Sequence, residues 1–422
     1  MKKVFLSIVS FAMICSLGAY SQNLAYNNSA SKHPYHFNSN SAADTTDYES
    51  RSLRLEEVNF VTSYYNQNGD HSPVTGGIGT EKVMDLSNGL DLKLTWTGDN
   101  QKKNTISAGL GFDYHTSASQ AYVSKTGASK TNGTRVYPSL DWTQEGKSGS
   151  FGVGAYVSSE YNYQSIGADV HFSRKIFANT GELSFKAQAY LDNVTLIYPS
   201  EFIPKTTTTV VTSASGKGSK ASIPTAGRNT YTGSISYSQM LTTRMQVMFL
   251  IDGVGQNGYL GLPFHRVYYN TGKDTIENLP STRYKLPLGF RLNYFVGDNL
   301  ILRTYYRYYT DSWGTRSNTA NFEIAYKFTP FFSISPFYRY YDQTAARYFA
   351  PYEVHKLTDQ YYTSNYAYSQ FNSSFFGAGI RIAPPKGVLG WENLHDVEIR
   401  YGHYSQTTDL VSDVLSMAFS FK

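Results

Sequence analysis

Residues 106–115 read ISAGLGFDYH, and apolar side chains occupy every second position. The apolar positions are Ile106, Ala108, Leu110, Phe112 and Tyr114, and they alternate with Ser107, Gly109, Gly111, Asp113 and His115. A period of two predicts a β-strand whose two faces meet different environments. The same alternation returns at 286–294 and at 415–421, and the apolar faces of all three runs lack charged residues.

Alternation of this kind recurs along most of the chain and predicts an all-β fold, a transmembrane antiparallel β-barrel of about 16 strands. Short connections alternate with long ones, as periplasmic turns and extracellular loops do in outer-membrane barrels. Abundant aromatics, 37 Tyr and 25 Phe, fit girdles at the two membrane interfaces. The predicted strands are 55–66, 86–97, 104–116, 133–144, 149–161, 164–176, 181–194, 228–240, 243–255, 283–295, 299–310, 317–328, 331–342, 371–383, 394–405 and 411–421.

The N-terminus has the pattern of a secretion signal. Lys2 and Lys3 precede an apolar stretch, and small residues around Ala19 predict cleavage after residue 21. We therefore expect a signal peptide at 1–21, a flexible periplasmic segment at 22–50 and the barrel at 51–422. Cys15, the single cysteine, lies in the signal peptide, so disulfides are not expected in the mature chain.

A formal charge of +5, without a block of like charge, argues against nucleic acid as a partner. The expected location is the cell outer membrane, with membrane lipid and the barrel-assembly machinery as partners. Phe421, next to the last residue, is an imperfect form of the aromatic assembly signal that ends such barrels.

Basic residues gather on the inward faces of the C-terminal strands. Two interpretations are open: a cationic wall that attracts anionic solutes, or internal pairing with inward carboxylates such as Glu323, Glu398, Asp141 and Asp169. We call this set the basic wall: Lys285, Arg291, Arg303, Arg307, Arg339, Arg381 and Arg400.

The long loops hold the remaining candidates. His265 and Arg266 lie in an LPFHR segment, while Tyr352 and His355 lie in a tyrosine-rich loop at 343–370. A segment at 259–269 is treated as loop, because one more strand would break the even count. The histidines show no metal-ligand spacing, so neither a metal nor a cofactor is expected.

Several segments together resemble a family. The most specific is GYLGLPFHRVY at 258–268, and the chain is similar over 50–422 to an uncharacterised family of outer-membrane barrels from diderm bacteria, known as a domain of unknown function. The resemblance implies the fold and location, and an envelope lipoprotein as a partner. The other segments are 54–59 (RLEEVN), 64–65 (YY), 74–81 (VTGGIGTE), 349–352 (FAPY), 376–379 (FGAG), 383–387 (APPKG) and 400–404 (RYGHY).

The expected function is a porin-like passage for small polar solutes, with a leaning toward anions, rather than an enzyme. One alternative is a closed structural barrel that binds a lipoprotein or a surface partner through its tyrosine-rich loops. A third interpretation is a lipid hydrolase at the rim, for which His115, Asp113 and Ser117 form a cluster at a strand end.

Overall fold

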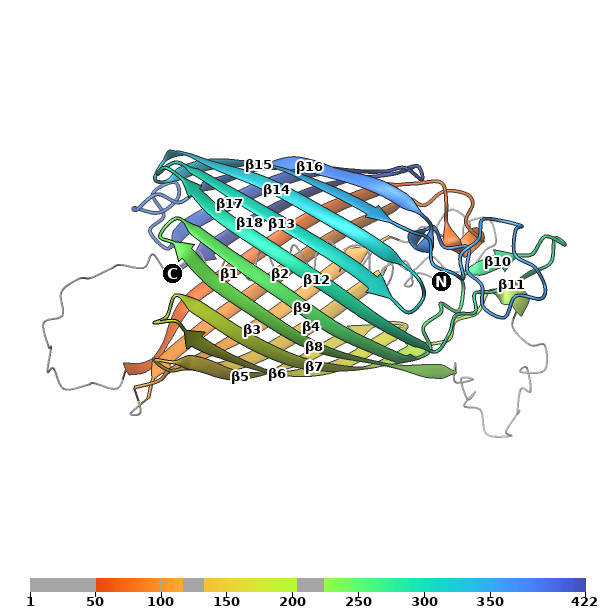
Figure 1. Cartoon of the computed structure of the whole chain (residues 1–422), viewed down its shortest axis with the longest axis horizontal. Coiled ribbons are helices and arrows are strands. Elements are labelled where there is room, and N and C mark those ends of the chain that lie inside the picture. The colour runs from red at the N-terminus through yellow and green to blue at the C-terminus, as the bar shows by residue number, and fades with distance from the viewer. Residues whose placement is uncertain (1–50, 99–100, 117–132, 203–223) are drawn as a thin grey trace, which may run out of the picture.

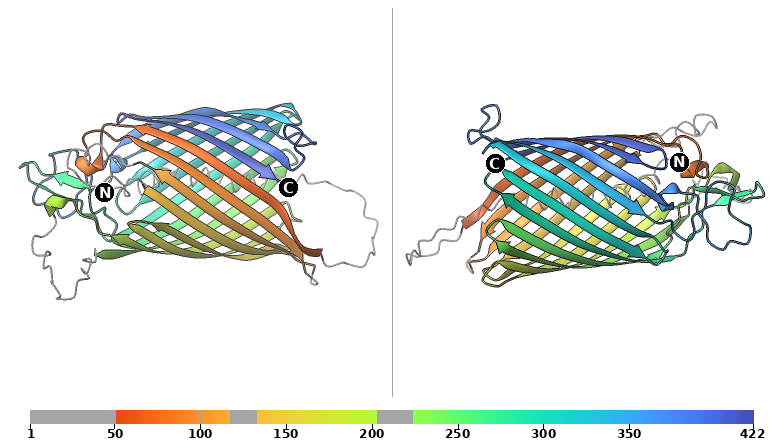
Figure 2. Two further views of the ribbon diagram at one scale, coloured as in Figure 1. Left: turned by 180° about the vertical axis from the view of Figure 1, so that it is seen from behind. Right: turned by 45° about the horizontal axis from the view of Figure 1, so that its top comes forward.

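The computed structural model describes residues 51–98, 101–116, 133–202 and 224–422. Sixteen antiparallel strands close into one barrel, a single layer of tilted strands seen from the side and from behind (Figures 1 and 2). Its strands are β1 (Arg51–Asn68), β2 (Val83–Thr97), β3 (Lys103–His115), β4 (Gly133–Glu145), β5 (Gly149–Glu160), β6 (Tyr163–Ile176), β7 (Gly181–Thr195), β8 (Thr225–Thr242), β9 (Met245–Gly258), β12 (Thr282–Val296), β13 (Leu300–Asp311), β14 (Arg316–Thr329), β15 (Phe332–Gln343), β16 (Phe371–Ile382), β17 (Leu394–Gln406) and β18 (Leu410–Phe421).

The predicted fold is confirmed, down to the number of strands. Each barrel strand pairs with the next one along the chain, and β1 pairs with β18 to close the ring. The signal peptide and the segment at 22–50 lie outside the described residues. No helix in the described ranges is both long and apolar enough to span a bilayer.

The two faces of the wall differ as the alternation predicts. On β3, Leu110 and Phe112 are exposed on the outside, whereas Asp113 and His115 are buried on the inside. On β12, Leu286 and Leu288 lie outward, and Lys285 and Arg291 lie inward. Backbone groups are paired strand to strand around the closed ring, so the outer surface suits a hydrocarbon solvent.

The two ends of the barrel also differ. Figure 1 places the C-terminus at the end where short turns join the strands. The connections at the other end include the long ones, 69–82, 259–281 and 344–370, but also tight turns at 161–162, 312–315 and 407–409. The lengths therefore alternate only in part, and we have no physical account of the three tight turns.

The connection from β9 to β12 forms a two-stranded sheet of its own, β10 (Arg266–Tyr268) and β11 (Asp274–Ile276). These strands pair with each other and remain outside the barrel sheet. The prediction that 259–269 adds no barrel strand is therefore right.

Candidate functional site

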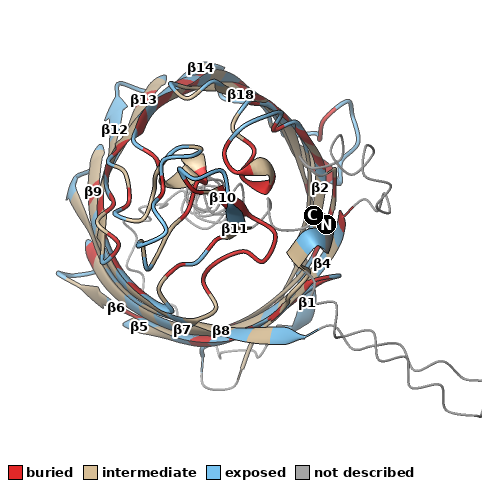
Figure 3. Cartoon of the chain, turned by 90° about the vertical axis from the view of Figure 1, so that its right-hand side faces the viewer, coloured by how far each residue is buried: buried red, intermediate tan, exposed pale blue. Residues whose placement is uncertain are grey.

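The long loops pack together at one end of the barrel. Seen from that end, β10, β11 and neighbouring loop segments lie within the outline of the ring (Figure 3). Val74, Leu262 and Phe264 form a buried cluster that Ile197 and Ala367 complete, so four separate connections contribute to it. We call this assembly of 69–82, 196–202, 259–281 and 344–370 the cap.

A second apolar cluster joins the cap to the barrel rim. Trp313, in the tight turn between β13 and β14, packs with Leu260 and Leu279 and against Tyr348 and Tyr368. The Trp313 indole N–H donates to the Thr282 carbonyl at 2.9 Å. The cap is thus attached to the wall by a large buried side chain as well as by its own ends.

Arg266 ties three loops together. Its side chain is buried, and its Nη1 donates to the Val74 carbonyl at 2.6 Å. Its Nε donates to Oε1 of Glu201 at 2.7 Å, in the short 3-10 turn η2 (Ser200–Phe202). Charge-assisted hydrogen bonds of this kind are strong, so Arg266 holds the cap in one arrangement.

The backbones of segments 69–82 and 344–370 also approach each other closely within the cap. Gly77 has φ +88°, and a Cβ there would lie 2.5 Å from the Ser364 carbonyl oxygen. Glycine alone tolerates both the backbone conformation and this distance. Beside it, the rings of His71 and Tyr366 stack with centroids 3.7 Å apart.

His265 lies beside the buried carboxylate of Glu277. Its Nδ1 is 3.6 Å from Glu277 Oε1, and neither ring nitrogen forms a hydrogen bond in the described part of the chain. Glu277 accepts from the Leu262 backbone N–H at 2.9 Å and from the Thr363 hydroxyl at 2.5 Å. The carboxylate, rather than the histidine, therefore links the loops 259–281 and 344–370.

His355 and Tyr352 both lie in the 344–370 segment of the cap, and His355 is buried. The two ring nitrogens of His355 contact Asp359 Oδ2 at 3.2 Å and the Thr363 carbonyl at 3.0 Å. The Lys356 backbone N–H holds the pKa of Asp359 below its ordinary value. Tyr352 packs its ring against Tyr268 at 4.8 Å. Both candidates thus serve contacts within the cap.

The basic wall lies on the lumen side of β12 to β17, and much of it is paired. Arg303 and Arg400 share Glu323, at 2.6 and 2.7 Å, and Arg400 also binds Glu398 at 2.9 Å. Arg381 forms an ion pair with Asp396. The remaining cations also have polar or ring contacts: Arg291 over Tyr305, Arg339 over Phe375, and Lys285 and Arg307 with other neighbours.

Carboxylates line the opposite part of the lumen. We call these residues the acidic wall: Asp85, Asp91, Asp113, Asp141, Glu160, Asp169 and Asp192, on inward positions of β2 to β7. Asp192 pairs with Arg228 at 3.2 Å, and Asp113 lies 3.9 Å from Arg135. In the described ranges neither Asp91 nor Asp141 forms an ion pair with a lysine or arginine, and Asp91 is exposed to the lumen.

Asp141, Asp169 and His171 form a cluster that the sequence did not indicate. His171 Nδ1 lies 3.0 Å from Asp169 Oδ1 and 3.8 Å from Asp141 Oδ2, and its Nε2 contacts the Thr143 hydroxyl at 3.0 Å. The ligand atoms lie within 4.8 Å of one another, close enough to hold a metal ion. The residues lie on β4 and β6, and they meet across β5 because Gly152 and Gly154 leave room.

Only two members of the proposed hydrolase cluster, His115 and Asp113, lie in the described residues. His115 is buried and lies 3.5 Å from Glu160 inside the barrel, while Asp113 accepts from Tyr137, and Ser117 lies outside the described ranges. On the outward face near the rim, His403 Nδ1 contacts Asp413 at 2.9 Å. No hydroxyl contacts His403 in the part of the chain that the structure describes.

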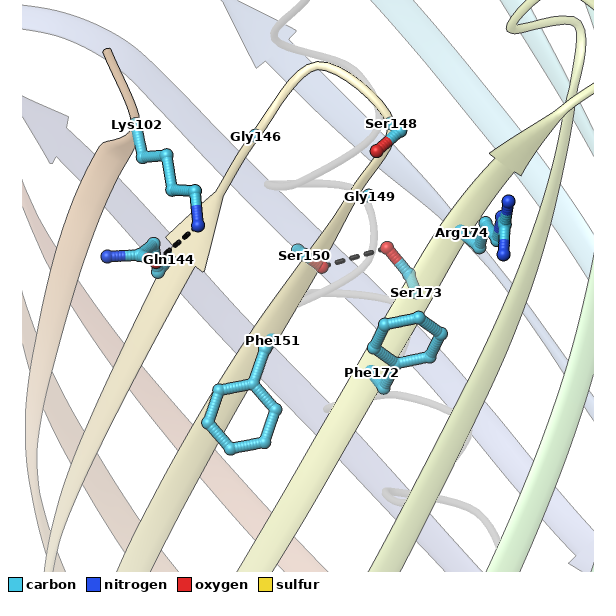
Figure 4. A pocket seen from close by; sticks show the side chains of 10 residues that line it. All are labelled: Lys102, Gln144, Gly146, Ser148, Gly149, Ser150, Phe151, Phe172, Ser173 and Arg174. Carbon is cyan, nitrogen blue, oxygen red and sulfur yellow. Dashed lines mark hydrogen bonds between the residues drawn. The ribbon is translucent and has the colours of Figure 1, made fainter. Parts of the chain in front are cut away.

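A recess at the turn end of the barrel lies between β4, β5 and β6 (Figure 4). Lys102 donates to Gln144 at 3.2 Å on one side, and Ser150 and Ser173 share a hydrogen bond of 2.8 Å on the other. The lining contains neither histidine nor carboxylate.

Comparison with protein families gives one match over most of the chain, residues 38–410. The chain belongs to this family, described as "Protein of unknown function (DUF3570)". The resemblance in the sequence is thereby confirmed. Comparison with curated proteins finds no match.

Solved structures similar to this DUF3570 chain include one described as a porin and two from Pseudomonas aeruginosa. They are a BenF-like porin from Pseudomonas fluorescens Pf-5 (8% identity, 88% of this chain and 98% of that one, TM-score 0.41), OccD3 (OpdP) from Pseudomonas aeruginosa (8%, 88% and 93%, 0.41) and OprD from the same species (9%, 88% and 94%, 0.40). The function proposed below rests on the residues of this chain.

Proposed function

We propose that this chain spans the outer membrane of a diderm bacterium and lets small polar solutes pass through its lumen. The observation that carries the proposal is the two-faced wall. Its outside is apolar, whereas charged side chains inside remain accessible to water: Lys186 is 37% exposed, Arg303 33% and Asp141 30%. Barrels with this number of strands leave room for an aqueous channel.

The location follows from the same surface. An outer belt of leucine, isoleucine, valine and phenylalanine is stable in lipid and costly in water. Closed barrels are the β-structures that cross membranes, because every backbone group is paired. Bacterial barrels of this form, with short turns at one end and loops at the other, reside in outer membranes.

The cap would limit the size of what enters. It lies across the mouth, has buried apolar clusters of its own and is tied down by Arg266 and Glu277. A solute therefore passes between the cap and the wall, where contacts with polar side chains replace its water.

Conductance in planar bilayers tests the proposal. Purified refolded protein should give discrete current steps, and a variant with residues 345–369 replaced by a short Gly-Ser turn should give larger ones. Heat-modifiable migration on gels confirms that each variant is folded. Folded protein that gives no steps, with or without residues 345–369, would contradict the passage.

A docking barrel is the second candidate, and one observation favours it. Val354 and Leu357, at the tip of the 344–370 loop, are 53% and 55% exposed, and no part of the cap covers them. Most tyrosines of this loop instead pack inside the cap. A barrel of this kind would conduct no ions, and a photo-crosslinker at Leu357 would capture an envelope lipoprotein.

A further inference from the structure

The charges of the lumen are segregated onto two facing walls. The strand order makes β2 to β7 and β12 to β17 two runs of six strands in a ring of sixteen. Two strands separate the runs on each side, β8 and β9 on one and β18 and β1 on the other. The centres of the two runs are therefore half a ring apart, and the acidic wall faces the basic wall across the lumen.

Neither wall is neutralised by its own counter-charges. On β2 to β7 the seven carboxylates of the acidic wall outnumber the five inward cations, which are Lys93, Lys103, Arg135, Lys175 and Lys186. On β12 to β17 the inward cations, to which Arg283 adds one more, outnumber Asp311, Glu323, Asp396 and Glu398. Most of these charges pair within their own wall. Asp192 instead pairs with Arg228 of β8, and Lys93 and Lys103 pair with Glu56 of β1. An excess of opposite sign remains on the two sides.

Two of the four separating strands, β8 and β18, carry mainly small hydroxyl side chains inward, whereas β9 also turns Met248, Leu250 and Val254 inward. On β8 the hydroxyl side chains are Thr230, Thr232, Ser234, Ser236 and Ser238, and on β18 they are Ser412, Ser416 and Ser420. Short uncharged side chains leave the space between the walls open to water. Few inward charges stand on these strands: Arg228 on β8, Asp252 on β9, and Glu57 with its neighbour Glu56 on β1, against seven carboxylates on the acidic wall and seven cations on the basic wall.

The surplus carboxylates point into accessible space. Asp91 is exposed on β2, and the Asp141 carboxylate accepts from the neutral Thr143 hydroxyl at 3.0 Å. On the basic side Arg303 is one-third exposed, although it is paired. Solutes in the lumen therefore meet negative charge on one side and positive charge on the other.

We infer that the lumen favours small zwitterions, solutes that carry an ammonium and a carboxylate a few bonds apart. Low-dielectric walls focus the field between opposite charges. A zwitterion gains from both walls when its ammonium turns toward the acidic wall and its carboxylate toward the basic wall. A simple anion or cation is attracted by one wall and repelled by the other, so neither is strongly preferred.

This inference rests on the proposed passage and replaces an anion preference by a dipolar one. Its test compares size-matched solutes in proteoliposomes: alanine as zwitterion, lactate as anion, alaninamide as cation and lactamide as neutral reference. Alanine uptake should exceed that of each of the others by about threefold or more. The reversal potential in a KCl gradient should stay near zero.

Removing charges from one wall should leave the lumen with an excess of charge of the opposite sign. In the double variant Asp91→Asn/Asp141→Asn, alanine should lose its advantage and the reversal potential should move toward chloride selectivity. Neutralising the other wall with Arg303→Gln should move it toward potassium. Asp413→Asn, on the outward face near the rim, is the matched control and should change neither quantity.

The outcomes separate the two proposals. Current steps with strong anion selectivity, or lactate uptake equal to that of alanine, would overturn the zwitterion preference and leave the passage intact. Absence of current steps and of uptake for all four solutes would overturn the passage, and the zwitterion preference with it.

Discussion

The barrel wall and the cap are built by opposite means. In the wall each strand pairs with its neighbour along the chain, so contacts are mostly between adjacent segments and repeat regularly. In the cap the decisive contacts join distant segments, such as Arg266 and Val74, which are 192 positions apart. The wall derives its stability from lipid outside and hydrogen-bonded strands, whereas the cap has small apolar cores of its own. Damage to one should therefore spare the other.

The largest effect is expected on the lipid face of the wall. Leu288→Arg places a charge outward near the middle of β12 and should lower the free energy of unfolding by about 2–4 kcal/mol. Equilibrium unfolding in lipid vesicles with urea measures it. The neighbour Gly289→Ser points inward, with its nearest new contact at 3.3 Å, and should have a mild effect. Equal losses at both positions would refute the assigned facing.

Loss of Arg266 should loosen the cap and leave the wall intact. Arg266→Met keeps the side-chain stem but leaves the Val74 carbonyl and Glu201 without their donor, at a cost of about 1.5–3 kcal/mol. Hydrogen exchange should speed up in 259–281 and 69–82 while the strands stay protected. Lys356→Met, on the exposed part of the same cap, serves as control. Unchanged exchange in the cap would mean that Arg266 does not hold it.

The glycines of β5 are expected to matter where side chains cross them. In Gly154→Ala the new Cβ would lie 2.3 Å from Asp169 Oδ2 and 2.8 Å from the Tyr156 hydroxyl oxygen. Overpacking of this kind costs about 1–3 kcal/mol in unfolding free energy. Gly253→Ala on β9, whose nearest new contact is 4.0 Å away, should be close to neutral. Similar unfolding curves for the two variants would contradict the close approach of the Asp169 and Tyr156 side chains to Gly154.

The most local effect concerns pH in the first loop of the cap. Burial, with Asp70 nearby, raises the pKa of Glu81 from 4.5 to about 8. Because the folded loop holds the proton more tightly, the stabilisation is complete below about pH 4.5 and is lost as the pH rises toward 8. Opening of 69–82 should rise by up to about tenfold per pH unit in that window, measured as exchange corrected for intrinsic rates. Glu81→Gln should remove this slope, and a slope that persists would assign it to another group.

The sequence was informative about the wall because its signals are local. Alternation at 106–115 and 286–294 already indicates which side chains face lipid, and the turns that join neighbouring strands settle the pairing order. The cap gave no comparable signal. His265 and His355 were visible as candidates, yet Glu277, which joins their loops, stands in a segment without periodicity.

The sequence by itself determined a closed, lipid-facing barrel and the inward position of the basic wall, because a period of two assigns every strand residue to one face. The tertiary structure alone decided what those faces meet. Closure of the ring set the acidic wall opposite the basic wall, brought Asp141 and His171 together across the glycines of β5, and folded distant loops into one cap. These relations depend on the curvature of the closed sheet and on contacts between segments far apart in the chain. The local alternation of side chains carries no information about either.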